Sequence, residues 1–107
     1  MNEEIKQKIQ KIAQTYGYDA QSRQCIEEMA ELTQAINKFW RKALDCGREK
    51  QPSGENYINM HYTYDDLVEE MADVQIMLWQ LEYLLNADTS ITIQQKLDRQ
   101  TERIERE

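Results

Sequence analysis

The segment that most restricts how this chain can fold is VQIMLWQLEYLL, residues 74–85, which carries apolar side chains on nearly every side of a helix. A helix that is apolar all round has to be buried all round. A chain of 107 residues forms one domain rather than two, and its remaining helices offer too little surface to enclose this one. We therefore expect a homodimer or a homotetramer with the apolar central helices at the interface.

The rest of the chain also favours helices. It contains only one Pro and three Gly, and strong helix formers are abundant. Apolar residues recur at helical spacing, and Gly17 and Gly47 stand where helices end. We predict a single all-α domain, residues 1–107, with four helices over about 3–16, 19–45, 64–86 and 90–106.

Residues 47–62 interrupt this pattern. They contain Pro52 and Gly54 and show no apolar period, so we predict a long loop there, and loops of this length are often functional. Thr63 would then be the N-cap of the next helix, and Asp66, three residues on, would complete a variant of the capping box.

Charge and cysteine content exclude several classes of function. The formal net charge of −7 argues against a nucleic-acid polymer or an anionic membrane surface as the partner. No window is apolar over the length of a membrane span, and MNEEIKQKIQ lacks the apolar core of a signal peptide. Cys25 and Cys46 have neither zinc-site nor redox-motif spacing. We expect a cytoplasmic protein with reduced thiols.

Two nearly identical acidic cassettes are the most informative motifs, IEEMAEL at 26–32 and VEEMADV at 68–74. Residues three or four apart share a helix face, so Glu28 neighbours Glu31, and Glu70 neighbours Asp73. Like charges at this spacing destabilise a helix, and burial beside apolar residues increases the cost unless a cation lies between them. The alternative is that both cassettes are solvated faces of an acidic protein.

The types of ligand in the cassettes indicate which metal they would hold. All candidates are carboxylates, and oxygen-only sites suit Mg²⁺, Mn²⁺ or Ca²⁺ rather than Zn²⁺. Di-iron helical bundles need Glu-x-x-His pairs, whereas the one histidine here, His61, falls in the predicted loop. Substrate phosphates and water usually complete a Mg²⁺ site. The cassettes therefore predict a Mg²⁺ site for a phosphorylated substrate, with Mn²⁺ as a substitute.

The order EEMAEL at 27–32 followed by EEMADV at 69–74 resembles the MazG-type all-α nucleoside triphosphate pyrophosphohydrolases. The likeness covers roughly residues 20–45 and 64–100, because NADTSITIQQKLDRQ resembles the family's short turn and basic Lys-x-x-Arg-Arg helix. It implies a four-helix MazG-like bundle that hydrolyses a nucleoside triphosphate to the monophosphate and pyrophosphate. Two departures stand out. As many as 38 residues separate Glu31 from Glu70, and Gln100 replaces the second Arg.

The resemblance also implies roles for individual residues. By position, the Mg²⁺ ligands would be Glu28, Glu31, Glu70 and Asp73. Phosphates would be held by Lys96 and Arg99, and either Glu27 or Glu31 would take the proton of the attacking water. From their position after Glu31, Asn37 and Lys38 are further candidates for contacts with the base or the phosphates, the alternative being a polar surface turn.

Other functions are compatible with the same residues. The chain could be a non-catalytic helical interaction or regulatory protein that retains the fold, or a metal-binding protein without nucleotide chemistry. Within the enzyme hypothesis, the preferred base and sugar, the number of metal ions and the choice of general base stay open. House-cleaning of damaged nucleotides, control of dUTP or dCTP and phage nucleotide metabolism are all compatible with it.

Overall fold

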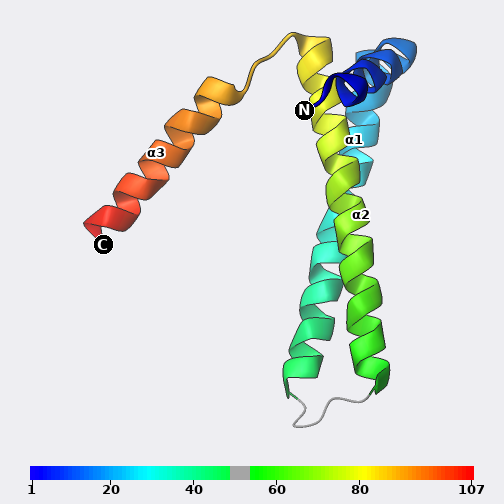
Figure 1. Ribbon diagram of the computed structural model, residues 1–107, viewed down its shortest axis with the longest axis vertical. Coiled ribbons are helices and arrows are strands. Elements are labelled where there is room, and N and C mark those ends of the chain that lie inside the picture. Colours follow the sequence, from blue (N-terminus) through cyan, green and yellow to red (C-terminus); the bar gives the residue numbers. More distant parts are fainter. Residues whose placement is uncertain (49–53) are drawn as a thin grey trace.

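The computed structural model describes residues 1–48 and 54–107, and every regular element in this part of the chain is a helix. The helices are α1, Glu3–Arg48, α2, Gly54–Leu85, and α3, Ser90–Arg106. The prediction of an all-α chain is thus confirmed for these residues. Helices α1 and α2 lie side by side as a long hairpin, and α3 leaves from the end where α2 terminates (Figure 1).

Gly17 divides α1 into two straight segments. Its backbone has φ 83° and ψ 170°, a conformation that glycine adopts without the steric cost of a Cβ atom. The predicted break between the first and second helices is therefore present. The segment before Gly17 crosses the C-terminal half of α2. There Ile5 and Ile12 line an apolar cavity together with Ile76 and Trp79.

The seam between α1 and α2 is built mainly from small side chains on α1. Cys25 and Cys46 are free thiols, as predicted, and both are buried. Burial raises the pKa of the Cys25 thiol, and the Glu28 carboxylate adds to the rise. Ala13 and Ala35 are buried along the same seam, and Met77 of α2 packs into it. Small residues at these positions allow the two helix axes to approach closely.

One polar pair crosses the seam where it is most buried. The side-chain amide of Gln21 donates to the side-chain oxygen of Gln80 over 2.8 Å, and Gln80 is only 2% exposed. A buried amide is tolerated when its hydrogen bonds are made within the protein. This hydrogen bond joins α1 to α2 in the buried part of the seam.

The prediction of a loop over residues 47–62 is wrong for most of its length. Helix α1 continues to Arg48 and α2 already begins at Gly54, while residues 49–53 lie outside the described part of the chain. Thr63 is not an N-cap but lies inside α2, where its hydroxyl donates to the carbonyl oxygens of Asn59 and Met60.

Contacts with α1 explain why this stretch is helical despite its lack of an apolar period. The Cys46 thiol donates to the backbone oxygen of Asn56 over 3.3 Å. The ring of Phe39 meets the ring of Tyr64 edge to face, with centroids 5.9 Å apart. Tertiary contacts of this kind override weak local propensity.

Helix α2 ends in a Schellman motif. Asn86 has a positive φ of 50°, its N–H donates to Tyr83, and the N–H of Ala87 donates to Glu82. Asp88 then accepts a hydrogen bond from the backbone N–H of Ser90, and its bonds to Ser90 lower the pKa of its carboxyl group. These bonds order the turn from which α3 begins.

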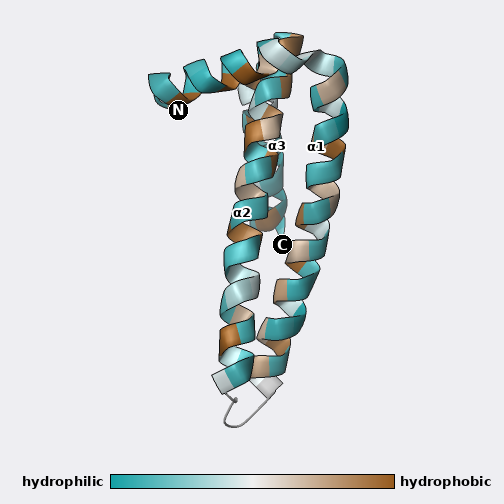
Figure 2. Cartoon of the chain, turned by 90° about the vertical axis from the view of Figure 1, so that its right-hand side faces the viewer, coloured by the Kyte–Doolittle hydropathy of each residue, from teal (hydrophilic) through white to brown (hydrophobic). Residues whose placement is uncertain are grey.

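Helix α3 packs against neither α1 nor α2, and none of its residues is buried. Over the described residues, a single chain therefore forms a hairpin with a projecting helix rather than a closed four-helix bundle (Figure 1). Apolar residues recur along both arms of the hairpin (Figure 2). In residues 1–48 and 54–107, no helix is long and apolar enough to cross a membrane.

Candidate metal centre

The hairpin brings the two acidic cassettes face to face. One carboxylate oxygen from each of Glu28, Glu70 and Asp73 lies within 4.8 Å of the others. Glu28 comes from α1, whereas Glu70 and Asp73 lie one turn apart on α2. Since α1 and α2 run in opposite directions, each cassette meets the other midway along the hairpin, and three of the four predicted ligands converge.

Two oxygens in this group are enclosed without a partner among the described residues. Oε2 of Glu28 and Oε2 of Glu70 are buried and accept no hydrogen bond there. The other oxygen of Glu28 accepts a bond of 2.9 Å from the side-chain amide of Gln24, one turn earlier on α1. A buried carboxylate oxygen without a donor or a cation is costly. This pair of oxygens is therefore the part of the seam that most needs a positive charge.

Glu31, the fourth predicted ligand, lies beside this trio and interacts with it. The charges of Glu28 and then Glu70 raise the pKa of Glu31 above its usual value. Burial raises the pKa of Glu70, and the charges of Asp73 and Glu28 raise it further. The carboxylates thus favour uptake of a proton or another cation at a site that holds several negative charges.

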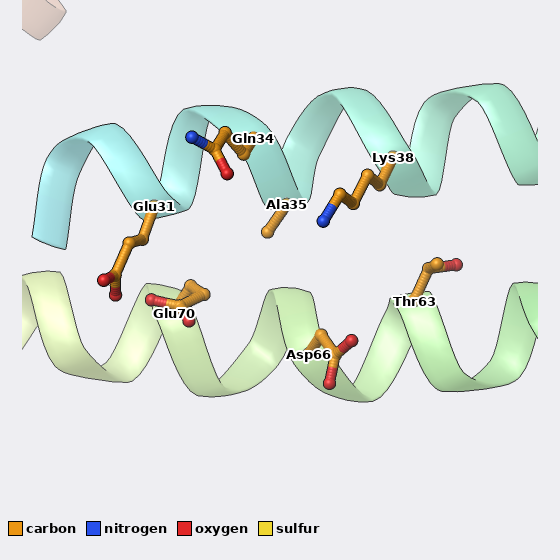
Figure 3. Close-up of a pocket in the computed structure, with 7 residues that line it drawn as sticks. All are labelled: Glu31, Gln34, Ala35, Lys38, Thr63, Asp66 and Glu70. Carbon is orange, nitrogen blue, oxygen red and sulfur yellow. The ribbon is translucent and has the colours of Figure 1, made fainter.

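A polar cavity of about 320 Å³ adjoins the acidic group. Glu31 from α1 and Glu70 from α2 extend toward each other at one end of it, and Lys38 reaches in from α1 further along (Figure 3). The remaining lining residues are Gln34, Ala35, Thr63 and Asp66. The cavity therefore joins the carboxylates to a cationic side chain and to several groups that form hydrogen bonds.

The residues present fit a hard divalent cation. The donor set consists of carboxylate oxygens, and within the described chain the two enclosed oxygens of Glu28 and Glu70 have no other partner. Mg²⁺ and Mn²⁺ prefer such oxygen ligands and keep some positions for water or phosphate. Asp73 is exposed on the open side of the group, which leaves room for those further ligands.

Two of the predicted site residues on α1 are not brought to this place. Glu27 is exposed and lies outside both the acidic trio and the lining of the polar cavity. Asn37 is also exposed and does not line the cavity, although its neighbour Lys38 does. Of the two candidates for taking a proton from water, Glu31 is therefore the better placed.

The predicted phosphate-binding residues Lys96 and Arg99 lie on α3. They surround a shallow cavity together with Gln100 and Arg103, and α3 contacts neither arm of the hairpin. Within one chain, this basic cluster stands apart from the carboxylates.

Two residues beside the carboxylates, Gln24 and Asp66, are missing from the predicted site. Gln24, which orients Glu28, lies four positions before it, and Asp66 lies four positions before Glu70. Helical spacing alone could have found both. The sequence pattern instead indicates a helix start at Thr63 and Asp66, an interpretation that depends on the predicted loop.

Comparison with known proteins leaves the family of this chain open. No protein-family model, curated protein or solved structure matches it. The resemblance to MazG-type enzymes accordingly rests on the two acidic cassettes and the basic segment after them.

Proposed function

We propose that this chain is a Mg²⁺-dependent nucleoside triphosphate pyrophosphohydrolase of the MazG type. The observation that carries the proposal is the meeting of the two cassettes, with oxygens of Glu28, Glu70 and Asp73 within 4.8 Å and two oxygens buried without a partner among the described residues. Two carboxylates facing each other across a helix pair would be an unfavourable arrangement for structure alone.

In this proposal Glu28, Glu70 and Asp73 hold the metal, with Glu31 at the edge of the group. Bound Mg²⁺ would supply charge neutralisation for the phosphates and a lowered pKa for water. The oxygen of water forms a bond to the α-phosphorus, and the bond from that phosphorus to the α–β bridging oxygen breaks. Pyrophosphate leaves with the bridging oxygen, and Glu31 accepts the water's proton.

The polar cavity is the place for the rest of the nucleotide. Lys38 offers a positive charge to a phosphate oxygen. Gln34, Thr63 and Asp66 present groups that can hydrogen-bond a sugar or a base. Lys96 and Arg99 can join this site only if a second copy of the chain supplies them, because α3 does not reach the hairpin of its own chain.

The proposal is tested by incubating the purified chain with each NTP and dNTP, with Mg²⁺ and with Mn²⁺, and measuring monophosphate and pyrophosphate. We expect turnover of at least one nucleotide. We also expect Glu31→Gln to reduce kcat by about 10²–10⁴-fold, the range that proton transfer by a positioned side chain contributes. Asp73→Asn should reduce turnover because it removes a metal ligand. Helix content measured by circular dichroism should not change.

The matched control is Asp65→Asn. Asp65 is an exposed acid on α2 that pairs with His61 at 3.6 Å, away from the cluster, and this variant should keep wild-type activity. If no nucleotide is turned over, or if Glu31→Gln stays fully active, the enzyme assignment is wrong, and the non-catalytic helical protein becomes the better hypothesis.

A further inference from the structure

Helix α3 has an apolar stripe that no other helix of the described chain covers. Ile93, Leu97, Gln100 and Ile104 follow one another at spacings of four, three and four residues, so they lie along one line of the helix. Ile93 and Leu97 are each 52% exposed, and Ile104 is 70% exposed. Most of the stability of a helix in a protein comes from packing of its apolar face, and α3, with 17 residues, has none buried, so we expect a surface to pack against it.

Helix α2 presents a matching stripe on the side that α1 leaves uncovered. It repeats at spacings of three and four residues over five intervals and consists of Val68, Met71, Gln75, Leu78, Glu82 and Leu85. Its apolar members are between 41% and 57% exposed. Two stripes with the same heptad spacing can interdigitate as knobs into holes.

The chain exposes more surface than a compact protein of its size. Its accessible area is 8619 Å², whereas a folded monomer of 12.8 kDa exposes about 6,300 Å². The radius of gyration is 18.3 Å, against about 13 Å for a compact domain of this length. The excess of roughly 2,300 Å² per chain is what an obligate homodimer buries.

The turn between α2 and α3 is ordered by local hydrogen bonds. They are the Schellman bonds at Asn86 and Ala87, the bond from Ser90 to Asp88 and the bond from the Thr89 hydroxyl to Glu82, and beyond them α3 points away from the hairpin (Figure 1). The angle between the two helices encloses a cavity of about 620 Å³, lined by Leu78, Leu85 and Ile93 among others. That space is open to side chains from another chain.

Charge also matches a contact between copies. Residues 90–107 contain four basic and four acidic side chains, so the net charge of −7 belongs entirely to the rest of the chain. On α3, Lys96, Arg99 and Arg103 form a line beside the apolar stripe. A helix that is basic along one edge is complementary to an acidic hairpin.

We propose that α3 of one chain packs its apolar stripe onto the exposed stripe of α2 in a second copy, and that the second copy returns the same contact. Such an exchange gives a closed dimer with twofold symmetry, in which both chains use the same two surfaces. It covers the exposed side of the apolar segment 74–85 with a helix that packs on neither arm of its own hairpin.

The test is the solution mass of full-length variants, measured by light scattering after size exclusion. Wild type should have at least twice the 12.8 kDa mass of the chain. Leu97→Lys on α3 and Leu78→Glu on α2 should each give monomers, because every contact in either homodimer contains a buried charge. Gln95→Lys, on the side of α3 opposite the apolar stripe, should behave as wild type.

Mixing the two monomeric variants distinguishes this contact from any other. In a mixed dimer, one contact has two wild-type stripes, and the other brings the introduced lysine of one chain against the introduced glutamate of its partner. We therefore expect the dimer to return. A monomeric wild type, an undisturbed Leu97→Lys dimer or a mixture that stays monomeric would each overturn the proposal.

Discussion

Among the polar pairs between α1 and α2, Gln21 with Gln80 and Glu28 with Glu70 are built in opposite ways. Gln21 and Gln80 are complementary, since the amide of one donates to the oxygen of the other. Glu28 and Glu70 are both acceptors, and each keeps a buried oxygen without a partner among the described residues. The first pair is complete within the protein, whereas the second needs a proton or a cation from outside. That difference separates a structural contact from a candidate site.

We expect the largest loss of stability when the hydrogen bond between Gln21 and Gln80 is removed. Gln80→Ala leaves Gln21 without its partner and opens space at a side chain that is 2% exposed. The free energy of unfolding should fall by about 3 kcal/mol, as measured by urea denaturation. The control Gln7→Ala removes an exposed amide from α1 and should change it by less than about 0.5 kcal/mol.

The double variant Gln21→Leu with Gln80→Leu tests whether the loss comes from an unsatisfied amide. We expect it to be more stable than Gln80→Ala. Replacing both partners by apolar groups of similar size is nearly neutral when the cost lies in an unsatisfied amide. A Gln80→Ala protein as stable as the Gln7→Ala control would show that the buried pair does not form.

For the acidic pair, Glu28 and Glu70, we expect the free energy of unfolding to rise when Mg²⁺ is added. At tenfold excess over its dissociation constant, a ligand bound only by the folded chain adds about 1.4 kcal/mol to the free energy of unfolding. We expect this gain for wild type and for Asp65→Asn, and its loss for Glu28→Gln and Glu70→Gln. Urea denaturation in Mg²⁺ and in EDTA measures it, and an equal gain in Glu70→Gln would place the metal elsewhere.

The sequence was sufficient to predict where the acids meet. Carboxylates one turn apart on each of two helices converge whenever those helices pair in opposite directions, and the apolar residues around Glu28 and Glu70 already placed these acids toward the seam. Gly17 likewise marked the break in α1, because its conformation has a local cause.

Other features depend on contacts that no local pattern encodes. Residues 54–62 are helical because they pack on α1 through groups such as the Asn56 carbonyl and because Tyr64 meets Phe39, and none of these makes an apolar period. The pairing of Gln21 with Gln80 joins amides that are 59 positions apart. The place of α3 could not be predicted either, since α3 packs on no other helix of the described chain and no contact reports its position.

The smallest effect is the pH dependence of stability without metal. The pKa values of Glu31 and Glu70 are raised above 4.5 in the folded chain, so the folded state binds protons more tightly than the unfolded state does. Their contribution to stability is complete below pH 4.5 and is lost as pH rises through the raised values. Urea denaturation in EDTA from pH 4.5 upward should show this fall, while Asp88, whose pKa is lowered, stays ionised.

Two changes should remove or reverse this slope. Glu31→Gln combined with Glu70→Gln removes the titrating groups, so stability should become flatter over the same range of pH. Saturating Mg²⁺ should reverse the sign, because a metal binds the deprotonated carboxylates and is released as they take up protons. If wild type in EDTA instead gains stability on going from pH 4.5 to neutral pH, the acids of the seam have partners of their own, and the contrast with Gln21 and Gln80 disappears.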